Sequence, residues 1–140
     1  MGCHLAIGGQ MPKSILIVDD SAAIRKFIRI FLENQPGFEV CGEGADGVEA
    51  VEKARELKPD LIVLDLSMPR MNGLGAAEIL RQVLPMVPII LFTAYKDAVL
   101  NEHALAAGVS SVVSKADGVE ILLSEVQKLT SVARLANVGL

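Results

Sequence analysis

Five side chains that could act together on a phosphoryl group each follow a short apolar run of the sequence. Asp19 and Asp20 follow SILIV, Asp65 follows LIVL, and Thr93 and Lys115 come after two later runs. Carboxylates packed together repel one another, and Mg²⁺, which prefers hard oxygen ligands, relieves that repulsion. A carboxylate beside Mg²⁺ can attack a phosphoryl group while the metal, a lysine and a hydroxyl stabilise the charge on the phosphoryl oxygens.

Asp65 is the residue that we expect to act as the nucleophile. The chemistry requires one carboxylate to be free for attack while the others hold the metal. Asp65 ends the predicted central strand, and the loop Ser67–Gly73 follows it. This position makes Asp65 the best candidate among the three carboxylates.

Strand-like and helix-like segments alternate along the chain. Apolar, β-branched runs predict strands at Ser14–Val18, Phe38–Cys41, Leu61–Leu64, Val87–Phe92 and Ser111–Val113. Helical spacing and capping residues predict helices that start at Ser21, Asp46, Leu74, Asp97 and Asp117. The first helix should present Phe27 and Ile28 to the core, and the last should run to about Arg134.

This alternation predicts an α/β fold of the (βα)₅ type, an open, doubly wound sheet. Four of the strands are apolar with little alternation, which is typical of a parallel sheet covered by helices on both faces. Phe38–Cys41 alternates more and suits an edge. Ligands of such sheets bind beyond the carboxyl ends of the strands, so the five side chains should meet at one edge.

Composition limits the class of protein. The chain has 140 residues, of which 51% are hydrophobic and 21% charged, and this balance favours one globular domain. A net charge of −4 disfavours a general nucleic-acid binder, and the apolar runs are too short to span a bilayer. Cys3 and Cys41 form no CxxC pair, which fits a reducing cytoplasm.

The ends of the chain differ from its middle. Residues 1–12 show neither a helical nor a strand period and carry no signal-peptide pattern, so we expect a disordered extension there. Residues 13–134 should form the single domain, and 135–140 a short tail.

Four segments together resemble the receiver domain of two-component response regulators, the CheY-like family. They are IVDDS, LIVLDLSMPRMNG, FTA and the lone lysine after the fifth predicted strand. The resemblance covers about residues 13–132. It implies a flavodoxin-like five-stranded parallel sheet with the strand order 2-1-3-4-5, and a cytoplasmic phosphoprotein that requires Mg²⁺.

The resemblance also implies a role for each site residue. Asp65 corresponds to the phosphoacceptor, and Lys115 to the lysine that pairs with the phosphorylated aspartate. Thr93 corresponds to the hydroxyl that follows the phosphoryl group on activation. The metal ligands would be Asp19, Asp20, Asp65 and the backbone carbonyl of Ser67.

A function in phosphorelay signal transduction follows from the resemblance. The chain would accept a phosphoryl group from a histidine kinase or a phosphotransfer protein and signal through a conformational change and partner binding. It would stand alone or be part of a longer regulator, with no direct contact to nucleic acid or membrane. The downstream protein is unknown, and a homodimer through the fourth and fifth helices is an open option. The chain would be no enzyme beyond assisting its own phosphorylation and dephosphorylation.

Two positions depart from the family pattern and keep alternatives open. Val112 stands where the family often has an aromatic switch residue, and Ala116 stands where a cis proline often follows the lysine, so a trans peptide bond is expected. A degenerate receiver that binds partners without phosphorylation is one alternative. A Mg²⁺-dependent phosphatase with an aspartate nucleophile is another, although that class typically places the nucleophile after the first strand in a DxD motif.

Two further positions tune the lifetime of the phosphorylated state in the family. They are Ser67 and Tyr95, and neither is an acid or an amide that could orient a hydrolytic water. Tyr95 is bulky enough to shield the phosphoryl group. The sequence therefore predicts a phosphoaspartate that lasts minutes to hours.

Overall fold

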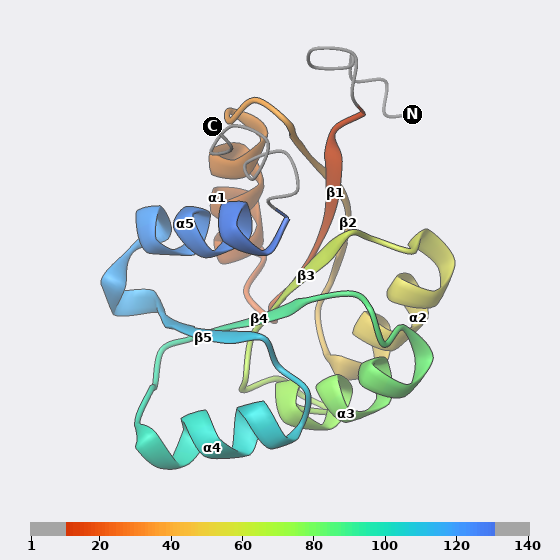
Figure 1. The fold of residues 1–140 in the computed structure, drawn as a ribbon, viewed down its shortest axis with the longest axis vertical. Helices are drawn as coiled ribbons and strands as arrows, with labels where there is room; N and C mark the ends of the chain where they lie inside the picture. The colour runs from red at the N-terminus through yellow and green to blue at the C-terminus, as the bar shows by residue number, and fades with distance from the viewer. Residues whose placement is uncertain (1–10, 131–140) are drawn as a thin grey trace, which may run out of the picture.

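Five strands and five helices alternate along the part of the chain that the structure describes, residues 11–130 of the computed structural model (Figure 1). The strands are β1 (Lys13–Val18), β2 (Phe38–Gly44), β3 (Leu61–Leu64), β4 (Ile89–Thr93) and β5 (Ser111–Ser114). The helices are α1 (Ala22–Glu33), α2 (Gly47–Leu57), α3 (Gly73–Val83), α4 (Ala98–Ala106) and α5 (Val119–Leu129), with a 3₁₀ turn η1 (Lys115–Asp117) before α5. The predictions for residues 1–10 and 135–140 lie outside the described residues.

The strands form one parallel sheet in the order β2-β1-β3-β4-β5, which confirms the predicted fold class and strand order. The predicted edge position of β2 is also confirmed. In the register between β1 and β3, Val18 lies opposite Leu64. The residues that follow them, Asp19 and Asp65, therefore leave the sheet side by side.

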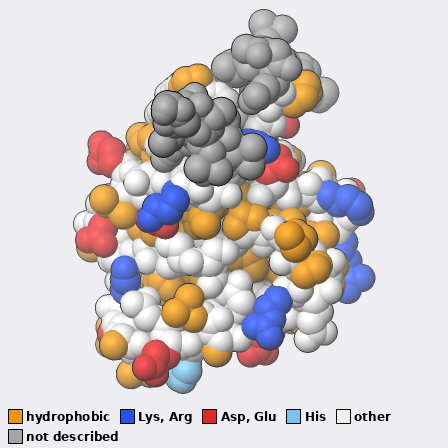
Figure 2. Space-filling view, in the orientation of Figure 1, with side chains coloured by type: hydrophobic (Ala, Val, Ile, Leu, Met, Phe, Trp, Pro, Cys, Tyr) orange, Lys and Arg blue, Asp and Glu red, His pale blue; other side chains and the backbone are white. Residues whose placement is uncertain are grey.

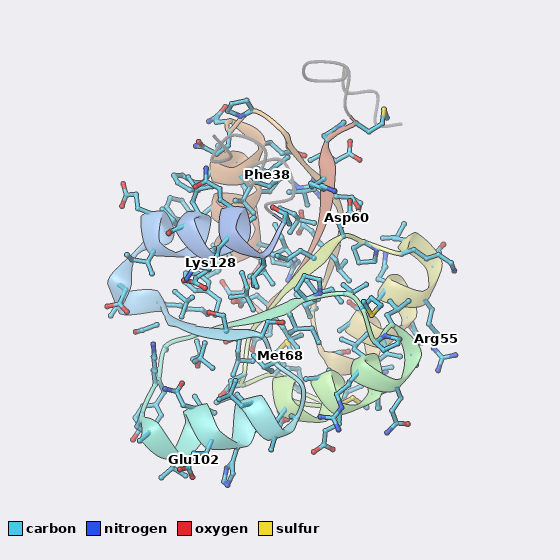
Figure 3. All side chains as sticks on the ribbon, viewed as in Figure 1. Phe38, Arg55, Asp60, Met68, Glu102 and Lys128 are labelled. Atoms are coloured by element: carbon cyan, nitrogen blue, oxygen red, sulfur yellow. The ribbon has the colours of Figure 1, made fainter. Side chains whose placement is uncertain are left out.

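Two hydrophobic cores lie on the two faces of the sheet. Leu16 and Val18 of β1 pack with residues of α2, α3 and α4, whereas Ile15 and Ile17 pack with α1 and α5. Successive side chains of a strand point to opposite faces, so an unbroken apolar strand supplies both cores. Figure 1 shows α1 and α5 on one side of the sheet and the other helices opposite, and Figure 3 shows side chains filling both layers.

Strand β2 is longer than predicted, because it continues through Gly44 rather than ending at Cys41. Its second half, Gly42–Gly44, has no apolar pattern, and it pairs with β1 after a shift in register between Ile15 and Leu16. Most side chains of this edge strand are only partly buried, so the strand needs fewer apolar residues than a central strand does.

The predicted caps Ser21 and Asp46 are confirmed, and Asp97, predicted as the first residue of its helix, is also a cap. The side chains of Ser21, Asp46 and Asp97 accept hydrogen bonds from backbone N–H groups of the first turns of α1, α2 and α4. The predicted core face of α1 is only partly right, because Ile28 is buried but Phe27 is 55% exposed. Phe27 lies one residue before the buried row, about 100° around the helix from Ile28.

The predicted cap of the last helix is wrong. Asp117 ends the 3₁₀ turn η1, and α5 begins after Gly118, which makes no side-chain cap bond. Ser114 accepts a hydrogen bond from the N–H of Ala116 and starts η1, and Gly118 adopts φ +93°, which allows the chain to turn into α5. Of the predicted extension to Arg134, residues 131–134 lie outside the described range.

The face shown in Figure 2 carries charges of both signs among exposed apolar side chains. Within residues 11–130, no helix is both long and apolar enough to cross a membrane.

A substitution at Gly73 tests how tightly the chain turns after β3. An added Cβ at this first residue of α3 would clash with the backbone carbonyl of Asp65. We expect Gly73→Ala to lower the free energy of unfolding by about 1–3 kcal/mol, measured by urea denaturation, because the backbone must shift.

Gly75→Ala is the matched control in the same helix. Its Cβ would lie 3.2 Å from Cγ of the flexible Met71 side chain and in ordinary contact with Asn72 Oδ1 at 3.7 Å, and alanine is favoured over glycine in a helix by about 1 kcal/mol. Equal destabilisation by both variants would contradict the proposed close approach at Gly73.

Candidate functional site

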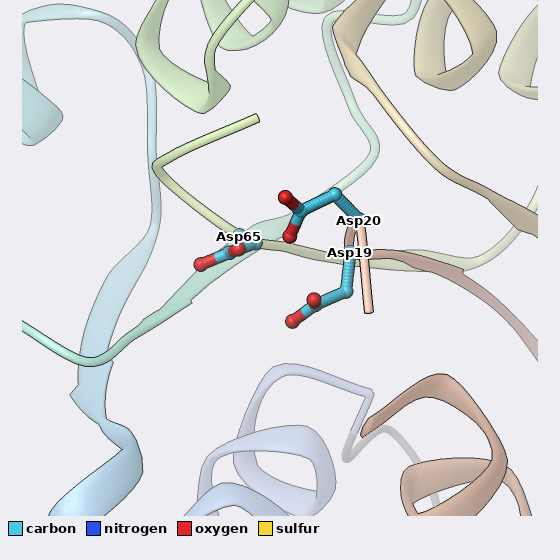
Figure 4. A group of neighbouring side chains, drawn as sticks. All are labelled: Asp19, Asp20 and Asp65. Atoms are coloured by element: carbon cyan, nitrogen blue, oxygen red, sulfur yellow. The ribbon is translucent and has the colours of Figure 1, made fainter. Parts of the chain in front are cut away.

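Three carboxylates converge where β1 and β3 end, as Figure 4 shows. Carboxylate oxygens of Asp19, Asp20 and Asp65 all lie within 4.8 Å of one another. Asp19 and Asp65 are only 2% and 7% exposed, whereas Asp20 is exposed. The parallel register brings them together, because the N–H of Asp65 donates to the carbonyl of Val18 at 2.9 Å.

Lys115 joins the three carboxylates from the end of β5. Its Nζ lies 2.8 Å from Asp19 Oδ2 and 3.5 Å from Asp65 Oδ1. The other oxygen of Asp19 accepts a hydrogen bond from the N–H of Ser21 at 2.9 Å, so both of its oxygens are held. The structure therefore brings four of the five predicted side chains into one cluster.

The pKa of Asp65 is raised above that of an ordinary aspartate. Burial is the main cause, and the negative charge of Asp19 adds to it. Lys115 and the N–H of Leu66, which donates to Asp65 Oδ1 at 2.9 Å, act in the opposite direction without cancelling the shift. Burial and the neighbouring charge of Asp19 thus disfavour the ionised form of Asp65.

The pKa of Lys115 is also raised. Burial alone would lower this pKa, but the hydrogen bond and charge of Asp19, together with the charge of Asp65, outweigh burial. Lys115 therefore stays an ammonium ion that lies between two carboxylates.

The charge and the donor atoms of the cluster fit Mg²⁺. Three carboxylates and one ammonium group leave two negative charges unbalanced, and a divalent cation carries the two positive charges that would balance them. Carboxylate oxygens are the donors that Mg²⁺ prefers, and an exposed residue such as Asp20 leaves room for the waters that Mg²⁺ retains.

The remaining two predicted site residues lie on loops or strand ends beside the cluster. Thr93 is the buried last residue of β4, and its Oγ1 accepts a hydrogen bond from the N–H of Tyr95 at 3.2 Å. Ser67 is exposed in the loop two residues after Asp65. The roles assigned to Thr93 and to the Ser67 carbonyl remain predictions. The peptide bond between Lys115 and Ala116 is trans, as predicted, since residues 11–130 contain no cis peptide bond.

An arginine that no sequence pattern indicated holds the backbone of Asp19, at the end of β1. Arg25 of α1 donates from Nη1 to the carbonyl oxygen of Asp19 at 2.6 Å and from Nε to Glu43 at 2.8 Å. Arg29 donates to the second oxygen of Glu43 at 2.7 Å. Burial alone would raise the pKa of Glu43, but the two arginines outweigh it and lower that pKa. The only sequence signal was an arginine pair one helical turn apart.

Comparison with known proteins identifies the class. A family model described as the response regulator receiver domain matches residues 15–127, so the chain belongs to the receiver domain family of response regulators. The response regulator domain of Thermotoga maritima CheB has a TM-score of 0.80 and 32% identity, covering 86% of this chain and 98% of that one. The resemblance predicted from the sequence is confirmed.

Curated relatives are longer proteins that share this domain. Response regulator protein VraR of Staphylococcus saprophyticus is 37% identical over 118 residues, 84% of this chain and 56% of the relative. A protein-glutamate methylesterase/protein-glutamine glutaminase of Carboxydothermus hydrogenoformans is 42% identical over 128 residues, 86% of this chain and 36% of the relative. The chain thus spans about half or less of these relatives.

Substitution of Asp65 tests the repulsion inside the cluster. In EDTA, we expect Asp65→Asn to raise the free energy of unfolding by more than the about 0.5 kcal/mol typical of surface substitutions, because the amide removes a buried like charge. The measurement is urea denaturation of metal-free protein. Glu102→Gln on the exposed side of α4 is the control, and it should have almost no effect.

The same comparison has a defined pH dependence. Because the pKa of Asp65 is raised by folding, the folded state binds its proton more tightly than the unfolded state. The contribution of Asp65 to wild-type stability should therefore fall as pH rises from the ordinary aspartate pKa through the raised one. The advantage of Asp65→Asn should be absent in acid and grow with pH. An advantage that is equal at all pH values would contradict this explanation.

Proposed function

We propose that this chain is a phosphorylatable receiver that accepts a phosphoryl group on Asp65 from a histidine kinase or a phosphotransfer protein. The observation that carries the proposal is the joint placement of Asp65, the acidic pair and Lys115 at one edge of the sheet. Membership in the receiver domain family supports it.

In the proposed reaction, Asp65 is the nucleophile. One carboxylate oxygen forms a bond to phosphorus, the bond between phosphorus and the donor's histidine nitrogen breaks, and that nitrogen keeps the electron pair. Mg²⁺, held by Asp19, Asp20, Asp65 and the Ser67 carbonyl, would neutralise charge on the phosphoryl oxygens. Lys115 lies near enough to Asp65 to pair with a phosphoryl oxygen.

Activation would change the partners of two side chains. The hydroxyl of Thr93 would turn from the N–H of Tyr95 toward a phosphoryl oxygen and donate to it. Lys115 would move its main contact from Asp19 to the phosphoryl group. Since Val112 replaces the usual aromatic residue, we propose that the change reaches the surface through the loop that contains Tyr95.

The signal would leave the domain through α4 and α5. Val99 and Leu105 of α4 and Ile121 of α5 are exposed apolar side chains, and they offer a surface to a downstream protein or to a second copy. A CheX–CheY–BeF3–Mg²⁺ complex from Borrelia burgdorferi contains a chain that matches with a TM-score of 0.78 and 26% identity. For this chain we propose a cytoplasmic protein partner, without direct nucleic-acid or membrane contact.

Phosphorylation by acetyl phosphate tests the proposal directly. With Mg²⁺, wild type should gain one phosphoryl group per chain, measured by intact mass. Asp65→Asn should gain none, and EDTA should abolish the reaction. Absence of labelling in a folded wild-type protein that still binds Mg²⁺ would favour a degenerate receiver. Sustained turnover of a chromogenic phosphate ester would favour the phosphatase alternative.

The lifetime of the phosphorylated state tests the roles of Ser67 and Tyr95. Both side chains are exposed, and neither is an acid or an amide of the kind that orients a hydrolytic water. We expect phosphate release over minutes to hours in wild type and faster release in Tyr95→Glu, because a carboxylate can orient that water. Release rates are measured after removal of the donor. Equal rates in the two proteins would contradict the proposed shielding by Tyr95.

A further inference from the structure

An ion pair ties the loop after Asp65 to the start of α2. We call residues 66–72 the β3–α3 loop. Arg70 in this loop donates from Nε to Asp46 Oδ2 at 2.8 Å and from Nη2 to Asp46 Oδ1 at 3.4 Å. Asp46 is the N-cap of α2, and its pKa is lowered, chiefly by the hydrogen bond from Arg70. The loop is therefore anchored to a helix that is distant in sequence.

The backbone conformation of Arg70 would favour glycine over arginine at this position if only the stability of the loop mattered. Arg70 has φ +66°, in the left-handed region where a side chain is disfavoured and glycine is preferred. The Arg70 side chain is 57% exposed and that of Asp46 is 9% exposed, so solvent screens the guanidinium and the ion pair contributes only modestly to stability. A glycine would fit this backbone with less strain, but it would provide no guanidinium for Asp46.

Further contacts hold the loop at both ends. The N–H of Gly47 donates to the carbonyl of Met71 at 2.9 Å, and a Cβ at Gly47 would clash with that oxygen. The N–H of Gly73 donates to the carbonyl of Leu66 at 2.8 Å. Between them, Met68 packs against the hydrophobic core (Figure 3). One hydrogen bond thus joins Leu66, at the start of the loop, to Gly73, directly after its end, and another joins Met71 to the start of α2.

These ties lead to both segments that carry the site. The carbonyl of Gly44, two residues before Asp46, accepts the N–H of Asp19 at 3.0 Å. Arg70 comes five residues after Asp65 in the same loop as Ser67. The pair of Arg70 and Asp46 therefore closes a ring of contacts through the ends of β1, β2 and β3.

We propose that Arg70 and Asp46 are positioning residues that hold the β3–α3 loop, with its Ser67 carbonyl, in the geometry that binds Mg²⁺ and admits the phosphoryl group. The inference rests on the proposed function and deepens it. Neither residue touches the reacting atoms, and both act through the backbone of the loop.

Two single variants remove the ion pair while retaining the local backbone. Arg70→Gly suits the left-handed φ and removes the guanidinium. Asp46→Asn retains an oxygen that can accept the N–H of Glu49 and so preserves the helix cap, but it loses the charge. Lys58→Gly is the matched control, because Lys58 is another exposed residue with positive φ, at the opposite end of α2.

Amide hydrogen exchange of the metal-free protein and Mg²⁺ titration calorimetry are the measurements. In Arg70→Gly and Asp46→Asn, we expect faster exchange of the Gly47 and Gly73 amides at an unchanged urea midpoint. Mg²⁺ affinity should fall about tenfold, as for other residues that orient metal ligands. The double variant should lose no more than either single one, and Lys58→Gly should match wild type.

The outcomes separate the two proposals. Wild-type exchange and Mg²⁺ affinity in both variants would overturn the positioning role. Faster exchange throughout the domain with a lower urea midpoint would also overturn it, because the pair would then act on global stability. A wild-type protein that binds no Mg²⁺ and accepts no phosphoryl group from acetyl phosphate would overturn the proposed function itself.

Discussion

Repulsion among three carboxylates at one sheet edge is the constraint around which this domain is organised. Asp19 and Asp65 cannot separate, because the pairing of β1 with β3 places them side by side. Lys115 balances one charge and leaves the pKa of Asp65 raised. The apolar strands that carry them, buried on both faces, offset this unfavourable energy. The excess negative charge makes this edge favourable for a divalent cation.

The strands and the cluster could be predicted because their signals are local or follow from topology. An apolar run such as Leu61–Leu64 identifies a buried strand, and parallel topology brings the residues after each strand to one edge. The missed pairs, Arg25 with Glu43 and Arg70 with Asp46, join charges on elements that are distant in the sequence, and no spacing rule identifies such partners. Asp117 was misassigned because an aspartate near a helix start suits a 3₁₀ turn as well as a cap.

The two loops that flank the cluster are held in contrasting ways. The β3–α3 loop is fastened through Arg70, Gly47 and Gly73. The loop from β4 to α4 is held at Thr93 by the bond from the N–H of Tyr95, and every residue from 94 to 99 is exposed. Local stability depends on burial and hydrogen bonding, so the loop from β4 to α4 should change conformation more readily than the β3–α3 loop.

This contrast between the two loops suggests that the proposed conformational change passes from the site to α4. If the Thr93 hydroxyl turns to a phosphoryl oxygen, the N–H of Tyr95 loses its acceptor and the segment leading to the α4 cap at Asp97 must adjust. A fixed β3–α3 loop would keep the metal ligands in place during that adjustment. The change would then be expressed at α4, whose exposed Val99 and Leu105 lie where a partner could detect it. In the proposed mechanism, the firmly held β3–α3 loop would therefore preserve the Mg²⁺ site while the loosely held loop from β4 to α4 transmits the change.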